Sequence, residues 1–117
     1  MNKEITILED DLDIREICTF IFSDEGYLVH GFGDVASFNG SPTFPSIFLL
    51  DIRLPDGDGR AVCKRLKSDP LYASIPVIMM SANTDLAGVM AACSADDFIQ
   101  KPFNIDNLLQ RVARLVE

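Results

Sequence analysis

The stretch IFLLD at residues 47–51 is a run of four apolar residues followed directly by an acid. A short, uniformly apolar run of this kind is typical of a strand in a parallel sheet whose two faces are both covered. The next segment, Arg53–Gly59, contains Pro55 and two glycines and is predicted to form a loop. Asp51 is therefore expected at the end of a buried strand, where its side chain projects over the edge of the sheet.

The same alternation of short apolar runs and helical segments extends along the whole chain. Four further runs are predicted to be strands: Ile5–Leu8, Tyr27–His30, Pro76–Met80 and Phe98–Gln100. Five segments are predicted to be helices, the second of them weak because the breakers NGSP follow it: Leu12–Asp24, Val35–Phe38, Arg60–Ser68, Leu86–Cys93 and Ile105–Val116. This order predicts an α/β fold, a three-layer sandwich in which a five-stranded parallel sheet is flanked by five helices.

Length, charge and hydropathy restrict the class of protein. The 117 residues are predicted to form one domain, residues 1–117, and 48% hydrophobic residues are enough for a sizeable core. The net charge of −8 argues against nucleic-acid binding, which needs clustered Lys and Arg. No apolar stretch approaches the roughly 18 residues that cross a bilayer. Because the N-terminus also lacks the apolar run of a signal peptide, we expect a cytoplasmic protein that does not contact membranes.

The cysteine and histidine content argues against metal centres built on sulfur or imidazole. The three cysteines, Cys18, Cys63 and Cys93, are widely spaced and form no Cys-x-x-Cys pair. We expect them to be small buried hydrophobic residues in a reducing compartment. With His30 as the single histidine, a zinc site or a histidine-based catalytic pair is not expected.

Polar side chains follow four of the predicted strands, each one or two residues beyond the apolar run. Glu9 and Asp10 follow the first strand, and Asp51, Ser81 and Lys101 follow the third, fourth and fifth. Taken singly, each has a commoner explanation, such as a helix cap, a loop serine or a solvated lysine. In a parallel sheet, however, the carboxyl ends of the strands meet at one edge, which is where ligands bind. The joint pattern therefore predicts one site, while Asp11 is assigned to capping the following helix.

The residue types at this site favour phosphoryl chemistry. Two like charges about 4 Å apart repel by about 4 kcal/mol at an effective dielectric constant near 20, so three clustered carboxylates need a cation or must stay partly protonated. Oxygen ligands with open positions suit Mg²⁺, or Mn²⁺ in its place. Lys101 reduces the repulsion and can pair with a phosphate, and Ser81 adds a hydroxyl donor. Together these groups predict phosphoryl transfer to an aspartate.

Four stretches carry a family resemblance: ILEDD at residues 7–11, IFLLDIRLP at 47–55 with Asp58-Gly59, PVIMMSA at 76–82 and ADDFIQKPF at 95–103. Over essentially its whole length the chain resembles the receiver domains of two-component response regulators, the chemotaxis-regulator-like fold. The resemblance implies a flavodoxin-like sheet with strand order 2-1-3-4-5. It also implies that Asp51 accepts a phosphoryl group from a sensor histidine kinase or a histidine phosphotransfer protein.

The resemblance further implies a role for each site residue. Asp10, Asp51 and the backbone carbonyl of Arg53 would hold the metal ion directly, with Glu9 assisting through water. Ser81 and Lys101 would contact the phosphoryl group. The aromatic ring of Phe98 would swing inward on phosphorylation. Arg53 and Asn83 would control the lifetime of the phosphoryl group.

Phosphorylation in this family changes an output face. In this chain that face would comprise Leu86–Cys93, Phe98–Gln100 and the last helix. Its altered affinity would act on an unknown downstream protein, and the same face could form a homodimer. Such a domain promotes only its own phosphorylation and dephosphorylation, so we do not expect an enzyme with a separate substrate.

The chain departs from the family pattern at three places, none of them at the acceptor site. The second helix is weak. The stretch from Ser81 to Ala95 is about two residues short. The apolar helix within it, interrupted by Gly88, suggests a protein-binding patch or a dimer contact, with an ordinary loosely packed helix as the alternative. Ser94 stands where many relatives have glycine, so the turn there is expected to differ.

Three alternatives stay open at the level of the sequence. A phosphatase of the haloacid-dehalogenase type would need a second carboxylate two residues after the nucleophile, where Arg53 stands. A flavin-binding module of the flavodoxin type would need a loop rich in Ser, Thr and Gly after the first strand, which is Glu9-Asp10-Asp11 here. The third alternative is an interaction domain on the same fold that works without phosphorylation.

Overall fold

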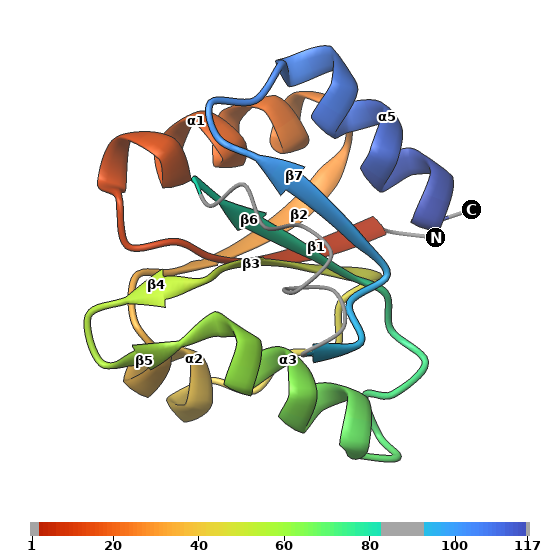
Figure 1. The fold of residues 1–117 in the computed structure, drawn as a ribbon. Helices are drawn as coiled ribbons and strands as arrows, with labels where there is room; N and C mark the ends of the chain where they lie inside the picture. The colour runs from red at the N-terminus through yellow and green to blue at the C-terminus, as the bar shows by residue number, and fades with distance from the viewer. Residues whose placement is uncertain (1–2, 83–92, 117) are drawn as a thin grey trace.

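The computed structural model describes residues 3–82 and 93–116. Its centre is a parallel sheet with the strand order β2-β1-β3-β6-β7 (Figure 1). The strands are β1 (Lys3–Leu8), β2 (Tyr27–Phe32), β3 (Ile47–Asp51), β6 (Val77–Ser81) and β7 (Asp97–Gln100). Since β6 and β7 are the predicted fourth and fifth strands, this is the predicted order 2-1-3-4-5.

Helices cover both faces of this sheet, which gives the predicted three layers. The helices are α1 (Leu12–Asp24), α2 (Val35–Gly40), α3 (Gly59–Ser68) and α5 (Ile105–Val116). In Figure 1, α1 and α5 lie on one face of the sheet, and α2 and α3 lie on the other. The helix predicted at 86–93 falls on residues that, except for Cys93, lie outside the described ranges.

The core consists of two apolar clusters separated by the sheet. One joins the strands to α2 and α3 through Phe38, Val62 and Leu66. The other joins them to α1 and α5, and its members include Phe22 and Leu108. The four apolar residues of β3 are all buried, as predicted for a strand covered on both sides, and Asp51 at its end is buried with them. Each fully buried Leu or Ile contributes about 1.5–3 kcal/mol, so the central strand is held firmly.

The segment after β3 is not the simple loop that was predicted for Arg53–Gly59. It contains two short antiparallel strands, β4 (Arg53–Leu54) and β5 (Gly57–Asp58), and α3 begins at Gly59. Gly57 packs closely on α2, because a Cβ there would lie 3.0 Å from a methyl group of Val35. The prediction failed because a two-residue strand is too short to show an alternation of apolar and polar residues.

The short helix α2 was predicted to be weak, and it has six residues. Its exposed backbone N–H groups are nevertheless satisfied. Asp56, at the tip of the β4–β5 hairpin, accepts hydrogen bonds from the N–H groups of Val35 and Ala36, at 2.8 and 2.9 Å. Asp34 accepts another from the N–H of Ser37 at 2.7 Å. Capping of this kind stabilises a helix whose own propensity is low.

The three cysteines are free and buried, as predicted. Among the described residues, no helix combines the length and the apolar character that a membrane span needs.

Candidate functional site

The predicted site residues meet at the carboxyl ends of the parallel strands. Asp51 and Ser81 are the last residues of β3 and β6, while Glu9, Asp10 and Lys101 directly follow β1 and β7. An open cleft at this edge is lined by most of the predicted set and by the β4–β5 hairpin: Asp10, Asp51, Arg53, Leu54, Gly57, Asp58, Ser81 and Lys101. The strand topology therefore brings together residues that are up to 92 positions apart.

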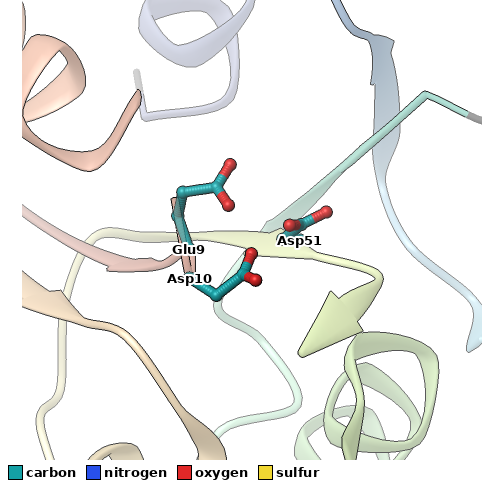
Figure 2. Close-up of side chains that lie close together, drawn as sticks. All are labelled: Glu9, Asp10 and Asp51. Atoms are coloured by element: carbon teal, nitrogen blue, oxygen red, sulfur yellow. The ribbon is translucent and has the colours of Figure 1, made fainter. Parts of the chain in front are cut away.

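Three carboxylates form the centre of the cluster. Glu9, Asp10 and Asp51 each offer an oxygen atom, and these atoms all lie within 4.8 Å of one another. In Figure 2 the three side chains converge from the loop after β1 and from the end of β3. Glu9 is fully buried, Asp51 is 6% exposed and Asp10 is exposed. Asp10 is thus the acid of the three that opens most fully to solvent.

Lys101 supplies the positive charge of the site. Its Nζ atom lies 2.5 Å from Oε1 of Glu9 and 3.2 Å from Oδ2 of Asp51. Burial by itself would lower the pKa of Lys101, but the hydrogen bonds and charges of Glu9 and Asp51 outweigh it and raise that pKa. Lys101 is therefore a charged ammonium group held over the acidic cluster, and it does not point away into solvent.

The buried acid Glu9 is hard to ionise. Burial, followed by its hydrogen bond with Asp51, raises the pKa of Glu9 to about 7, although Lys101 and the N–H of Asp11 act in the opposite direction. Glu9 therefore keeps its proton to a higher pH than an ordinary glutamate does. This agrees with the expectation that three clustered carboxylates stay partly protonated unless a cation joins them.

The backbone around Asp51 is fixed by a close approach. A Cβ atom at Gly59 would lie 1.7 Å from the carbonyl oxygen of Asp51, so only glycine fits. The N–H of Gly59 also donates to the carbonyl of Ile52 at 2.7 Å. In the side chain, Oδ1 of Asp51 accepts from the N–H of Ile52 at 2.8 Å, whereas Oδ2 faces Lys101.

Asp11 stands apart from the cluster in the capping role that was assigned to it. Its Oδ1 atom accepts from the N–H of Ile14 at 3.1 Å and caps α1. The N–H of Asp11 donates to Oε2 of Glu9, also at 3.1 Å. The start of α1 therefore helps to orient the buried acid.

The other residues predicted for the site lie at different places in the structure. Ser81 is buried at the edge of the cleft. Phe98 is 5% exposed and already lies inward, packed in the cluster that includes Leu50 and Met79. The exposed side chain of Arg53 lies at the cleft, while Asn83 lies outside the described residues.

One contributor was missed by the sequence analysis. Nη1 of Arg15, on α1, donates a hydrogen bond of 2.6 Å to the backbone carbonyl of Glu9. Two glycines of the second-strand region, Gly31 and Gly33, lie beside the Arg15 side chain. A glycine in or next to a strand often marks a close approach of other atoms, and that was the available signal.

The cluster fits a divalent cation by the chemistry of its donors. Hard cations such as Mg²⁺ and Mn²⁺ prefer carboxylate and carbonyl oxygens and keep positions open for water. Glu9, Asp10 and Asp51 supply such oxygens at one point, and the exposed Asp10 lies on the open side. A cation there would also favour the ionised form of Glu9, which burial disfavours.

Comparison with known proteins gives one consistent result. The family model of the response regulator receiver domain matches residues 5–113. The DNA-binding response regulator MtrA of Mycobacterium tuberculosis is 35% identical over 98% of this chain and 51% of MtrA. The chain spans about half the length of the curated relatives it matches.

Solved structures agree in fold. The signal receiver domain of a signal transduction histidine kinase from Syntrophus aciditrophicus has a TM-score of 0.88 and 33% identity, covering 97% of this chain and 89% of that one. The BeF3-activated receiver domain of DrrB from Thermotoga maritima has a TM-score of 0.89 and 28% identity, and the match covers 99% of this chain and 98% of that one. With the family model spanning all but the ends of the sequence, this chain belongs to the response regulator receiver domain family.

Proposed function

We propose that this receiver domain accepts a phosphoryl group on Asp51 and passes a signal by changing its affinity for a partner protein. The observation that carries the proposal is the position of Asp51, whose Oδ2 atom lies 3.2 Å from the ammonium group of Lys101 beside Glu9 and Asp10. In the transfer, a carboxylate oxygen of Asp51 forms a bond to phosphorus. The bond from phosphorus to the imidazole nitrogen of a phosphohistidine donor breaks, and the imidazole leaves with that electron pair.

The residues around Asp51 each have a proposed part in this step. Lys101 pairs with a phosphoryl oxygen and compensates the charge that arrives with it. Ser81 donates its hydroxyl group to another oxygen. Asp10, Asp51 and the backbone carbonyl of Arg53 are proposed to hold Mg²⁺ or Mn²⁺, with Glu9 acting through water. The bound cation would neutralise charge on the transferring phosphoryl group.

The donor is proposed to be a sensor histidine kinase or a histidine phosphotransfer protein that docks on α1. That helix begins two residues after Asp10, and its outward side carries three exposed apolar residues: Leu12, Ile17 and Phe20, at 54%, 48% and 73%. Exposed apolar patches of this kind commonly mark protein contacts. Phe20→Ser is therefore expected to slow transfer from a phosphorylated donor protein but not from a small acyl phosphate.

The output is proposed to involve Phe98, which is buried on the edge strand β7, and the output face expected from the sequence, to which β7 and α5 belong. Phosphorylation turns the singly charged carboxylate of Asp51 into an acyl phosphate with about two negative charges and three further oxygen atoms, and this change biases an element that has two arrangements. A downstream protein, or a second copy of the chain, would then bind that face. The domain changes only its own phosphorylation state and turns over no separate substrate. Arg53 and Asn83 are proposed to set the phosphoryl lifetime.

The rival functions lack comparable support. Arg53 stands where a phosphatase of the haloacid-dehalogenase type needs its second carboxylate, and the loop after β1 is acidic where a flavin phosphate would need N–H and hydroxyl donors. An interaction domain that works without phosphorylation would not require Lys101 to be held between two buried acids.

The test is phosphorylation by a small acyl phosphate, followed by the intact mass. With Mg²⁺ the chain is expected to gain one phosphoryl group, and with a chelator it is expected to gain none. Asp51→Asn should abolish the gain, whereas Asp24→Asn, an exposed acid at the far end of α1, should leave it unchanged. Failure of the wild-type chain to gain mass in Mg²⁺ would contradict the proposal.

A further inference from the structure

Arg15 reaches the acidic site from outside it. Its Nη1 atom donates a 2.6 Å hydrogen bond to the carbonyl oxygen of Glu9, the residue that directly precedes Asp10. The N–H of the same Glu9 donates to the carbonyl of Phe32 at 2.9 Å. Both backbone polar groups of Glu9 are thus bound, one by α1 and the other by β2, and the turn that presents Glu9 and Asp10 is fixed from two sides.

The neighbouring strand leaves room for this contact. A Cβ atom at Gly33 would lie 2.7 Å from Nη1 of Arg15, the same atom that bonds to Glu9. At Gly31 a Cβ would lie 3.5 Å from the Arg15 stem, an ordinary contact distance. The absence of a side chain at Gly33 therefore lets the guanidinium group sit where it meets the Glu9 carbonyl.

We propose that Arg15, in the space that Gly33 leaves open, is a positioning residue that holds the Glu9–Asp10 turn in its cation-binding arrangement. The inference rests on the proposed cation site. Groups that orient metal ligands without touching the metal are often worth 10-fold or more in metal affinity. A guanidinium group suits this task because its rigid donors keep their direction better than the flexible ammonium group of a lysine.

The charge of Arg15 and its positioning role predict opposite effects on Mg²⁺ affinity when Arg15 is removed, so the inference can be tested. Arg15 is a cation near an acidic site, so by charge alone its removal should tighten Mg²⁺ binding. If Arg15 positions the turn, its removal should weaken Mg²⁺ binding instead. Gly33→Ala separates the two effects further, because it displaces the guanidinium group while leaving the charge of the chain unchanged.

The experiment is calorimetric titration of the folded chain with Mg²⁺. Arg15→Met, which keeps much of the apolar stem, is expected to weaken Mg²⁺ binding about tenfold, and Arg15→Lys less. Gly33→Ala should weaken it in the same direction and add nothing further in the Arg15→Met background. Gly40→Ala, where an added Cβ meets no atom within 4 Å, is the matched control and should bind Mg²⁺ like the wild type.

Unchanged or tighter binding by Arg15→Met, or unchanged binding by Gly33→Ala, would overturn the positioning role while leaving the cation site in place. Failure of the wild-type chain to bind Mg²⁺ would overturn the cation site and the positioning role together. Should Arg15→Met fail to fold, Gly33→Ala still decides the matter, because only the far end of a flexible side chain must move to accommodate it.

Discussion

The ammonium group of Lys101 lies between Glu9 and Asp51, 2.5 Å from the first and 3.2 Å from the second. This contact joins the loop after β1, the end of β3 and the residue after β7. One positive charge faces two buried acids and the exposed Asp10, so the cluster without a cation carries unbalanced negative charge. Ionisation of Glu9 and binding of a cation are therefore coupled, and both should be measurable.

The stability of the cation-free chain should fall as the pH rises from about 5 to 8. Glu9 has a pKa of about 7 in the folded chain and an ordinary value of 4.5, so the folded chain retains a proton that the unfolded chain releases. This contribution to stability is complete below the ordinary pKa of 4.5, and it is lost as the pH rises through the folded-state pKa of about 7. The loss is at most about 3 kcal/mol. Urea unfolding in a chelator measures it.

The control for this prediction is Glu9→Gln, which cannot ionise at that position. Its free energy of unfolding should depend much less on pH over the same range, and added Mg²⁺ should stabilise the wild-type chain most at the higher pH. An equal fall in Glu9→Gln would assign the pH dependence to another group.

Gly59→Ala should strongly destabilise the fold and displace the acceptor residue. The added Cβ would lie 1.7 Å from the carbonyl oxygen of Asp51, and backbone atoms offer no flexible end that can move aside. A loss of more than about 3 kcal/mol in the free energy of unfolding is expected. Gly40→Ala again serves as the control, and an equally small loss in both variants would disprove the close approach.

Ser94→Gly should stabilise the chain. Ser94 has a φ angle of 58°, in the left-handed region that costs a residue with a Cβ about 1–2 kcal/mol. Ser94 thus adopts a conformation that favours glycine. The expectation that this turn differs from that of relatives with glycine stays a prediction. Relief of this cost should raise the free energy of unfolding by about 1 kcal/mol, less the extra entropy of glycine in the unfolded chain. Ser94→Ala should bring no gain, and a gain from alanine would point to another cause.

The cysteine thiols should be inert in the native chain. Burial raises the pKa of Cys18 and of Cys63 to about 12 in each case, so almost no thiolate is present at neutral pH. Cys93 is 1% exposed. A disulfide reagent such as Ellman's should label no thiol quickly under native conditions and all three after unfolding. Rapid labelling of one thiol in the native chain would contradict the observed burial.

The fold could be predicted where it depends on the hydrophobic pattern and on residues that begin or end a helix. The helix Leu12–Asp24 has its predicted bounds, because Asp11 caps its start and Gly26, with a φ of 89°, ends the helical segment. The central strands differ from prediction by one to a few residues at their ends. Strands as short as β4 and β5 have too few residues to show such a pattern. Their position depends on contacts outside the hairpin, such as that of Asp56 with the N–H of Ala36.

The site was predictable where parallel topology alone brings residues together. Asp10, Asp51 and Lys101 follow from their positions at strand ends, and their proximity was confirmed. The contact of Arg15 with the Glu9 carbonyl could not be predicted, because an arginine on a helix is usually solvated and the direction of its side chain depends on packing. The hydrogen bonds from the first N–H groups of α2 to Asp56 were missed for the same reason.

The central claim is that Asp51, and no other acid of the cluster, carries the phosphoryl group. Treatment of the phosphorylated chain with borohydride reduces an aspartyl phosphate to homoserine, and peptide mass spectrometry then locates the residue that has changed. We predict homoserine at position 51 alone. Conversion at Asp10 or Asp58 in place of Asp51, or no conversion in a chain that has gained the phosphoryl mass, would contradict the account.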